Sequence, residues 1–260
     1  MQSRLSRSVV EVRRRLARGS AYLRFRDLML HIGRNNPWVT REDLARRYVD
    51  GDGIEIGAGT LPLRVPPRAR VRYVDNIDRD VLVDRAGDDF LGPNIDVADA
   101  PTVDVIDDAQ TLGTFPDESV DFIIANHVLE HVEDPIGALE SFARVTRRGG
   151  IIFITLPDAR HSFDYLRERT TVEHLLRDHA DGPQTSREQH YAEWAEFIEG
   201  IGPEGIPARS AEYAAAGAHH HFHVWELETF LELLSARDVN CELLHAQLNQ
   251  KEFAVILRRR

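Results

Sequence analysis

Short runs rich in valine and isoleucine recur along the first 155 residues, and several of them end close to an acidic residue. Apolar runs without clean polar alternation are typical of strands buried on both faces of a parallel sheet. They alternate with segments of helical period, which favours an α/β fold with a doubly wound, mostly parallel sheet. Strands are predicted at 53–56, 71–74, 103–106, 120–125 and 151–155, and helices at 37–48, 135–145 and 224–234.

The last third of the chain has a different pattern. Two apolar runs, 239–248 and 252–257, are separated by the short polar link 249–251 and predict a C-terminal antiparallel hairpin. A long polar stretch with helical patches at 172–179 and 187–199 precedes them, and we expect it to form a helical lid insertion that faces the substrate. The expected units are a basic arm or helix (1–36), the cofactor-binding half of the core (37–156), the lid (157–218) and the C-terminal part of the core (219–260).

Charge is unevenly distributed along the chain. The formal net charge is -11, but residues 1–34 hold nine arginines against Glu11 and Asp27, so this arm carries +7 and the rest carries -18. The acidic body argues against broad electrostatic capture of nucleic acid, while the arm either packs as an amphipathic helix or contacts a polyanion, an anionic membrane or the protein's own acidic face. The single Cys241 forms no intrachain disulfide, and no apolar run has a membrane-spanning length. We therefore predict a cytoplasmic protein without a transmembrane segment, and self-association is left open.

A glycine turn follows the first predicted strand. Glu55 lies two residues before Gly57-Ala58-Gly59, and glycines allow the backbone to approach a ligand closely. The turn lacks the third glycine of a dinucleotide-binding G-x-G-x-x-G motif, because that position is Pro62. A carboxylate here would repel phosphates, whereas it pairs well with an ammonium group and suits a sulfonium-bearing ligand.

This Glu-x-Gly-x-Gly segment resembles the first motif of class I S-adenosylmethionine-dependent methyltransferases, and the resemblance continues through most of residues 50–158. It implies a Rossmann-like fold and S-adenosylmethionine as the cofactor. Asp75, twenty residues after Glu55, stands where the family holds the ribose hydroxyls, and Asp108-Ala109 where it holds the adenine. The implied cofactor-binding residues are Glu55, Gly57, Ala58, Gly59, Asp75, Asn76, Asp108, Ala109 and Asn126.

Residues 126–131 follow the fourth predicted strand, where the acceptor chemistry of this fold begins. Methylation of an alcohol requires a general base or a metal ion, because the hydroxyl must lose its proton. If this segment is helical, His127, Glu130 and His131 share one face. The set resembles the Glu-x-x-Glu-His site of metal-dependent O-methyltransferases, with His127 in place of the first glutamate. Those enzymes take a further histidine from a later segment, so the predicted ligands of a divalent metal, Mg or Mn, are His127, Glu130, His131, His221 and His223.

A metal-free mechanism is the alternative, because Leu-Glu-His-Val is also widespread in class I methyltransferases that bind no metal. His127 is then the catalytic general base, and His161, after the fifth strand, is a second catalytic candidate. For His174, His179 and His190 we expect ordinary surface roles.

The acceptor is suggested by a further resemblance. Leu156-Pro157-Asp158 and His221-Phe222-His223-Val224-Trp225 are similar to segments of bacterial saccharide O-methyltransferases, including those of methylmannose polysaccharide synthesis. This implies a small saccharide or oligosaccharide acceptor, with substrate contacts at Asp158, Arg160 and Trp225. The lid aromatics either stack on sugar faces or pack the lid onto the sheet; they are Tyr165, Tyr191, Trp194, Tyr213 and Trp225.

Two other functions fit the same sequence. An RNA-terminal 2′-O-methyltransferase is suggested by the arginine-rich arm and the three candidate ligands at 127–131. A non-catalytic cofactor-binding interaction module is the third alternative.

Overall fold

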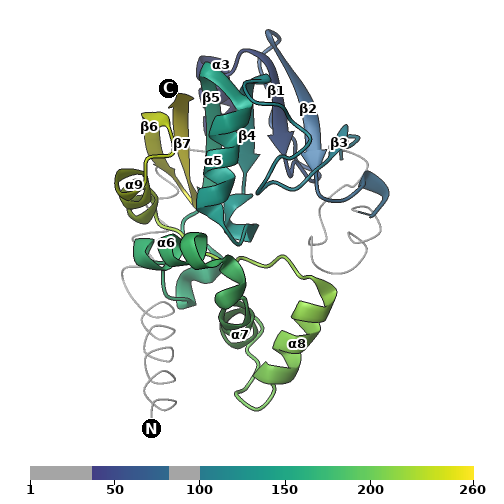
Figure 1. The fold of residues 1–260 in the computed structure, drawn as a ribbon, viewed down its shortest axis with the longest axis vertical. Coiled ribbons are helices and arrows are strands. Elements are labelled where there is room, and N and C mark those ends of the chain that lie inside the picture. Colours follow the sequence, from purple (N-terminus) through teal and green to yellow (C-terminus); the bar gives the residue numbers. More distant parts are fainter. Residues whose placement is uncertain (1–36, 82–99) are drawn as a thin grey trace.

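A computed structural model describes residues 37–81 and 100–260, which form a seven-stranded sheet in the order β3-β2-β1-β4-β5-β7-β6 (Figure 1). Only β7 runs antiparallel to its neighbours β5 and β6, and the other pairs are parallel. The predicted Rossmann-like α/β fold with a C-terminal antiparallel hairpin is therefore confirmed. The strands are β1 (Gly51–Ile56), β2 (Ala69–Asp75), β3 (Val105–Ile106), β4 (Val120–Asn126), β5 (Thr146–Pro157), β6 (Cys241–Asn249) and β7 (Glu252–Arg259).

Strand order reverses between β1 and β4. The chain builds outward from β1 through β2 to β3 and then returns to place β4 on the other side of β1. In open α/β sheets such a switch point leaves a crevice at the carboxyl ends of the strands, where ligands bind. The carboxyl ends of β1 and β4 carry the glycine turn and His127, so both predicted halves of the site meet there.

Apolar side chains cover both faces of the sheet. Ile123 and Ile154 belong to the cluster that packs under α5 (Pro135–Val145) and α9 (Leu227–Ala236). Phe122, Ile124 and Phe153 point the other way, into a cluster with Leu44 and Ala45 of α3 (Pro37–Tyr48). Residues 122–125 of β4 are completely buried, which explains why this strand has no polar alternation in sequence.

Local signals set the boundaries of α5. Pro135 occupies the first turn, where its missing N–H is not needed, and the Asp134 carboxylate accepts a hydrogen bond from the Gly137 N–H at 2.9 Å. The helix lies along one face of the sheet (Figure 1).

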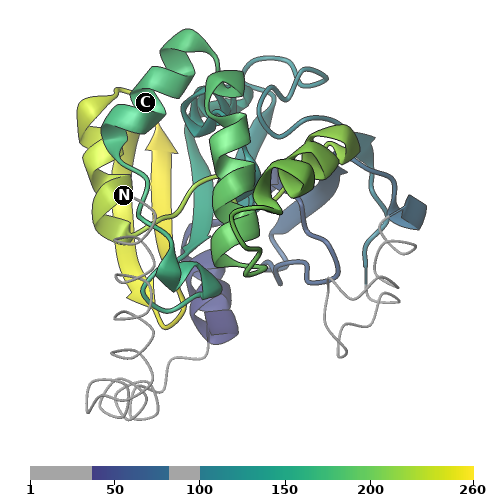
Figure 2. The ribbon, with the colours of Figure 1, turned by 90° about the horizontal axis from the view of Figure 1, so that it is seen from below.

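The predicted helical insertion lies beyond the carboxyl edge of the parallel strands (Figures 1 and 2). It contains α6 (Val172–Asp181), α7 (Arg187–Phe197) and α8 (Ile206–Ala216), with short 3-10 turns at Phe163–Leu166 and Pro183–Thr185. A further 3-10 turn, Leu129–His131, lies outside the insertion, between β4 and α5. Helices α7 and α8 share a small apolar cluster of their own that includes Tyr191, Trp194, Tyr213 and Phe222.

None of the helices in the described ranges is long and apolar enough to cross a membrane. The predicted basic arm, 1–36, lies outside the described residues.

Candidate functional site

The glycine turn after β1 has the backbone that its sequence predicts. Gly57 and Gly59 have φ values of +61° and +54°, a region that L-residues with side chains seldom occupy. A Cβ on Gly59 would meet nothing within 4 Å, so the glycine is needed for its conformation and the space beside it is open. The turn is anchored to β2 by the Gly57 N–H, which donates to the Val74 carbonyl at 2.8 Å.

The buried side chain of Glu55 holds the segment that follows this turn. Its side chain is 1% exposed, and its two carboxylate oxygens lie 3.0 and 3.1 Å from the Leu63 N–H, while the Asn126 amide donates to one of them at 3.4 Å. Burial raises the pKa of Glu55 to about 7, against the lowering effect of these hydrogen bonds. The carboxylate thus fixes the far end of the turn, and its contact with a ligand's ammonium group stays a prediction.

Two more acidic residues lie at the carboxyl ends of β2 and β3, the next strands toward the edge of the sheet. Asp75 ends β2, and its carboxylate accepts a hydrogen bond from the Ile77 N–H at 3.4 Å. Burial raises the pKa of Asp75, although backbone hydrogen bonds oppose this. Asp108 follows β3, is exposed, and accepts from the Gln110 N–H at 2.7 Å. Because β1, β2 and β3 are neighbours, Glu55, Asp75 and Asp108 form a row along one edge of the sheet, flanked by Asn76 and Ala109.

Asp107 has a structural role beside this row. Its carboxylate accepts hydrogen bonds from the backbone N–H groups of Asp108, Gly113 and Thr114, which shapes the loop that presents Asp108.

His127 occupies the carboxyl end of β4 with a left-handed backbone, φ +54°. Non-glycine residues seldom adopt this conformation, which costs on the order of 1–3 kcal/mol and clusters at functional sites. Its side chain is 38% exposed, and its Nε2 lies 2.8 Å from Glu252 Oε2. The imidazole is therefore both accessible and held by a carboxylate.

Glu252 and Arg41 were missed in the sequence. The Arg41 Nε donates to Glu252 Oε1 at 2.9 Å, and the Asn249 amide donates to the same oxygen at 2.8 Å. Burial would raise the pKa of Glu252, but hydrogen bonds from Arg41 and His127 lower it. One signal was available: Glu252 starts an antiparallel strand, so it lies opposite Pro157 at the carboxyl end of β5.

Glu130, His131 and His221 form a compact group in which one ligand atom of each residue lies within 4.8 Å of those of the others. Glu130 is fully buried, and neither carboxylate oxygen has a hydrogen-bond partner. His131 Nδ1 lies 3.0 Å from the His219 carbonyl, and His221 Nδ1 lies 2.7 Å from Asp164 Oδ2. Each of these Nδ1 atoms faces an oxygen acceptor and therefore carries the hydrogen of its ring. The Nε2 atoms of His131 and His221 then keep their lone pairs for a metal.

The predicted ligand set is thus partly assembled. His127 Nδ1 lies 3.4 Å from Glu130 Oε1, adjacent to the group. His223 was predicted as a ligand of the same metal, but it does not lie in this group; it lies in a second group with His174 and His190. The expected surface role of His190 is also wrong, since His190 is 5% exposed. His179 is only partly buried and lies 2.9 Å from an Asp134 carboxylate oxygen.

Asp158, Arg160 and His161 lie together after β5. Asp158 is fully buried and accepts hydrogen bonds from Arg160 Nε and Nη2 at 2.8 and 2.6 Å, with His161 Nδ1 at 3.6 Å. Burial alone would raise the pKa of Asp158, but hydrogen bonds from Arg160 and His161 lower it to about 2. The buried carboxylate orients Arg160 and does not itself face solvent.

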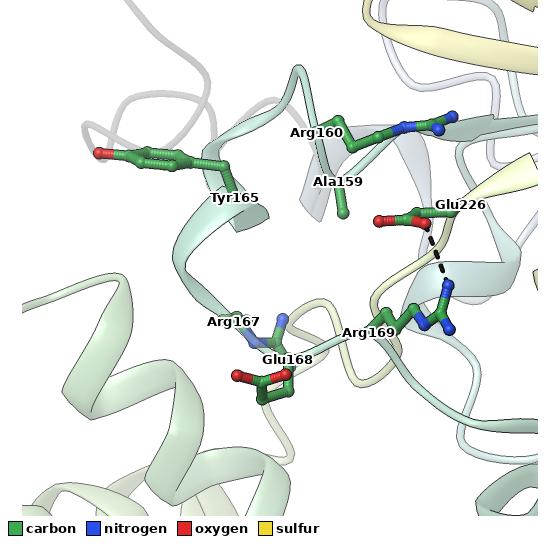
Figure 3. A pocket seen from close by; sticks show the side chains of 7 residues that line it. All are labelled: Ala159, Arg160, Tyr165, Arg167, Glu168, Arg169 and Glu226. Atoms are coloured by element: carbon green, nitrogen blue, oxygen red, sulfur yellow. Dashed lines mark hydrogen bonds and ion pairs between the residues drawn. The ribbon is translucent and has the colours of Figure 1, made fainter. Parts of the chain in front are cut away.

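A polar cavity of about 300 Å³ opens beside Arg160 (Figure 3). One wall is Arg167, which donates to Asp164 Oδ1 at 2.9 Å and to the His221 carbonyl at 2.7 Å, so the cavity adjoins the group of Glu130, His131 and His221. Tyr165, 40% exposed, is also at its edge. The lining residues are Ala159, Arg160, Tyr165, Arg167, Glu168, Arg169 and Glu226.

Trp225 does not fit its predicted role. It is 1% exposed and packs edge-on against Phe230 at a centroid distance of 5.6 Å, so it offers no face to a sugar. Tyr191, Trp194 and Tyr213 are also buried, in the cluster between α7 and α8, which supports the packing alternative for these aromatics. Tyr165 is the one aromatic of the proposed stacking set that is exposed.

A family model described as a methyltransferase domain matches residues 56–154, from the end of β1 to within β5. The matched segment contains the glycine turn, Asp75, Asp108 and residues 126–131, and the fold around it is the one expected for the class I enzymes.

Individual proteins similar to this chain were also found, and the similar segment of the first covers about half of each chain. An uncharacterized protein of Methanocaldococcus jannaschii is 32% identical over 122 residues, which cover 47% of this chain and 52% of that protein. The match therefore spans about half the length of that relative. Two solved structures are similar at low identity. A SAM-dependent methyltransferase from Methanosarcina mazei is 16% identical with a TM-score of 0.44, and the match covers 82% of this chain and 95% of that one. A protein from Pyrococcus horikoshii is 14% identical with a TM-score of 0.47, and the match covers 93% of each chain.

Proposed function

We propose that this protein is an S-adenosylmethionine-dependent O-methyltransferase that methylates a saccharide hydroxyl. The observation that carries the proposal is the row of Glu55, Asp75 and Asp108 next to the His127–Glu252 pair. The row provides donor-binding groups, and the pair provides a group that accepts a proton. The two lie on neighbouring strand ends at the switch point of the sheet.

The residues of the row suit the donor. Asp75 offers carboxylate oxygens to a diol, Asp108 and the Ala109 N–H suit an adenine edge, and the open space beside Gly59 admits a ligand close to the backbone. When bound, S-adenosylmethionine supplies a methyl group on a positively charged sulfur. A carboxylate at Glu55 favours the positive end of such a ligand.

His127 is proposed to accept the proton. Because its Nε2 lies 2.8 Å from the Glu252 carboxylate, the hydrogen is placed on Nε2, and Nδ1, which lies 3.4 Å from Glu130 Oε1, is the nitrogen that accepts a proton. His127 Nδ1 would accept the proton of the acceptor hydroxyl, and the methyl group that the donor supplies would pass to that oxygen, with the donor's sulfur left as a neutral thioether. Glu252 positions His127 and stabilises the imidazolium that forms.

A divalent metal fits beside this base. The buried Glu130 carboxylate has no hydrogen-bond partner and only a 3.4 Å contact with His127 Nδ1, and an anion so poorly compensated is costly in the protein interior. Glu130, His131 and His221 would hold the ion, and a bound divalent cation lowers the pKa of a nearby hydroxyl. Asp164 and the His219 carbonyl orient the two imidazoles.

The polar cavity supports a sugar acceptor. Its walls carry three arginines and two glutamates, which suit a ligand rich in hydroxyl groups, and Tyr165 adds an aromatic edge.

The test is a product screen with isotope-labelled S-adenosylmethionine and a panel of sugars, sugar oligomers, lipids and RNA. Mass spectrometry of an O-methylated sugar product supports the proposal, and turnover confined to another acceptor class contradicts it. Treatment with EDTA separates the two mechanisms: activity restored by Mg or Mn supports the metal, whereas activity that survives EDTA and disappears in His127→Ala supports the base alone.

A further inference from the structure

A second group of histidines lies inside the helical insertion and takes no part in the proposed reaction. His174 comes from α6, His190 from α7, and His223 from the segment that precedes α9. One ligand atom of each lies within 4.8 Å of those of the other two. His190 and His223 are 5% and 0% exposed, and the side chain of His174 is 15% exposed.

The spacing of the ring nitrogens resembles that of metal ligands. His174 Nε2 lies 3.2 Å from His190 Nε2 and 3.0 Å from Asp178 Oδ2, and His190 Nε2 lies 3.9 Å from the same oxygen. Two ligands of a tetrahedral zinc ion, each about 2.0–2.1 Å from the metal, stand a little over 3 Å apart. Asp178 is 1% exposed and offers a further buried ligand atom next to His174 and His190, outside the compact group of the three histidines.

Outer hydrogen bonds already orient two of these residues. His223 Nε2 lies 3.1 Å from the Glu133 carbonyl, so this nitrogen carries the hydrogen and the buried Nδ1, which has no partner, keeps its lone pair. Ser186 Oγ donates to Asp178 Oδ2 at 2.6 Å. Histidine ligands of metals almost always donate their other N–H in this way.

We propose that His174, His190 and His223, with Asp178, form a structural zinc site separate from the Glu130, His131 and His221 group. Three imidazoles and one carboxylate favour zinc over the hard cations Mg and Ca. The ion would cross-link α6, α7 and the segment that contains His223. Since the Phe222 N–H donates to the Glu130 carbonyl at 2.7 Å, the cross-link also fixes the segment that carries His221 beside Glu130.

The test measures zinc in the full chain after chelation, reloading with one equivalent of zinc chloride and gel filtration. Four proteins are compared: the wild type, His190→Gln, His131→Gln from the other group, and His245→Gln as a control in β6, where His245 lies 2.7 Å from Gln247 Oε1. We expect one zinc per chain in all but His190→Gln. Loss of a ligand should weaken zinc affinity by more than the roughly 10–100-fold that loss of an outer-shell partner causes.

Two measurements keep the test decisive if His190→Gln folds poorly. Zinc X-ray absorption of the wild type should show three nitrogen ligands and one oxygen ligand, and zinc should raise its Tm by about 5–10 °C at 100-fold excess over Kd. Asp178→Asn, with circular dichroism as a check of folding, should bind zinc more weakly. A wild type that takes up no zinc, or zinc that is lost in His131→Gln and kept in His190→Gln, overturns the proposal.

Discussion

Glu55→Gln should stabilise the ligand-free protein at alkaline pH while it weakens donor binding. The pKa of Glu55 rises to about 7 from a usual value of 4.5 because burial disfavours its charged form. At about 1.4 kcal/mol per pKa unit, the folded state is penalised by about 3 kcal/mol above pH 7. The glutamine has nearly the same shape and keeps an oxygen for the Leu63 N–H, so the penalty disappears without loss of that contact.

The sign follows from proton binding. Between pH 4.5 and about 7 the folded state holds more protons at Glu55 than the unfolded state does, so this group lowers stability as the pH rises through that window. The difference in unfolding free energy between Glu55→Gln and the wild type should therefore grow by about 2–3 kcal/mol from pH 5 to pH 8.

Urea denaturation at both pH values measures this difference, with Glu204→Gln as an exposed control that should show no such change. Calorimetric titration at pH 8 should show S-adenosylmethionine binding weakened about 10–100-fold by Glu55→Gln, the range expected for a hydrogen bond to a charged group. A constant stability difference between pH 5 and pH 8, or a mutant that binds the donor as tightly as the wild type, refutes the reasoning.

Three other variants test separate parts of the site. Asp75→Asn should weaken donor binding about 10–100-fold in the same titration with little change in Tm, because a charged acceptor for the diol becomes neutral. His127→Ala should lower kcat by about 10²–10⁴-fold with unchanged donor affinity. Glu252→Gln should lower kcat less and shift the pH profile of kcat. If either variant lost donor binding as strongly as Asp75→Asn does, the division of roles would be contradicted. Trp225→Ala should cost about 3–5 kcal/mol in urea denaturation and Trp225→Phe much less, whereas near-equal stability of all three proteins would rule out the core role.

The sequence predicts well where Glu55, Asp75 and Asp108 lie relative to the strands. Strand ends are local features, so Glu55, Asp75 and Asp108 could be placed from apolar runs and the glycine turn alone. Their alignment then follows from strand order, since β1, β2 and β3 are neighbours. Residues 122–125 also illustrate why the sheet was predictable: burial on both faces leaves a continuous apolar run.

The acceptor side depends on contacts between distant segments. His221 and His223 are two residues apart, yet one lies against Glu130 and the other against His174 and His190. The neighbouring sequence does not distinguish these two histidines, because their partners come from distant segments: α6 and α7 for His223, and the segment after β4 for His221. Glu252 was missed for a similar reason: only the antiparallel pairing of β7 with β5 brings it to His127.

Calorimetric titration of the purified protein with S-adenosylmethionine tests most directly whether the row of Glu55, Asp75 and Asp108 holds this donor. We predict one binding site per chain that is lost or strongly weakened in the double variant Asp75→Asn/Asp108→Asn, which should keep the fold of the wild type. Absence of binding at millimolar ligand, or equal affinity in the folded double variant, would contradict it.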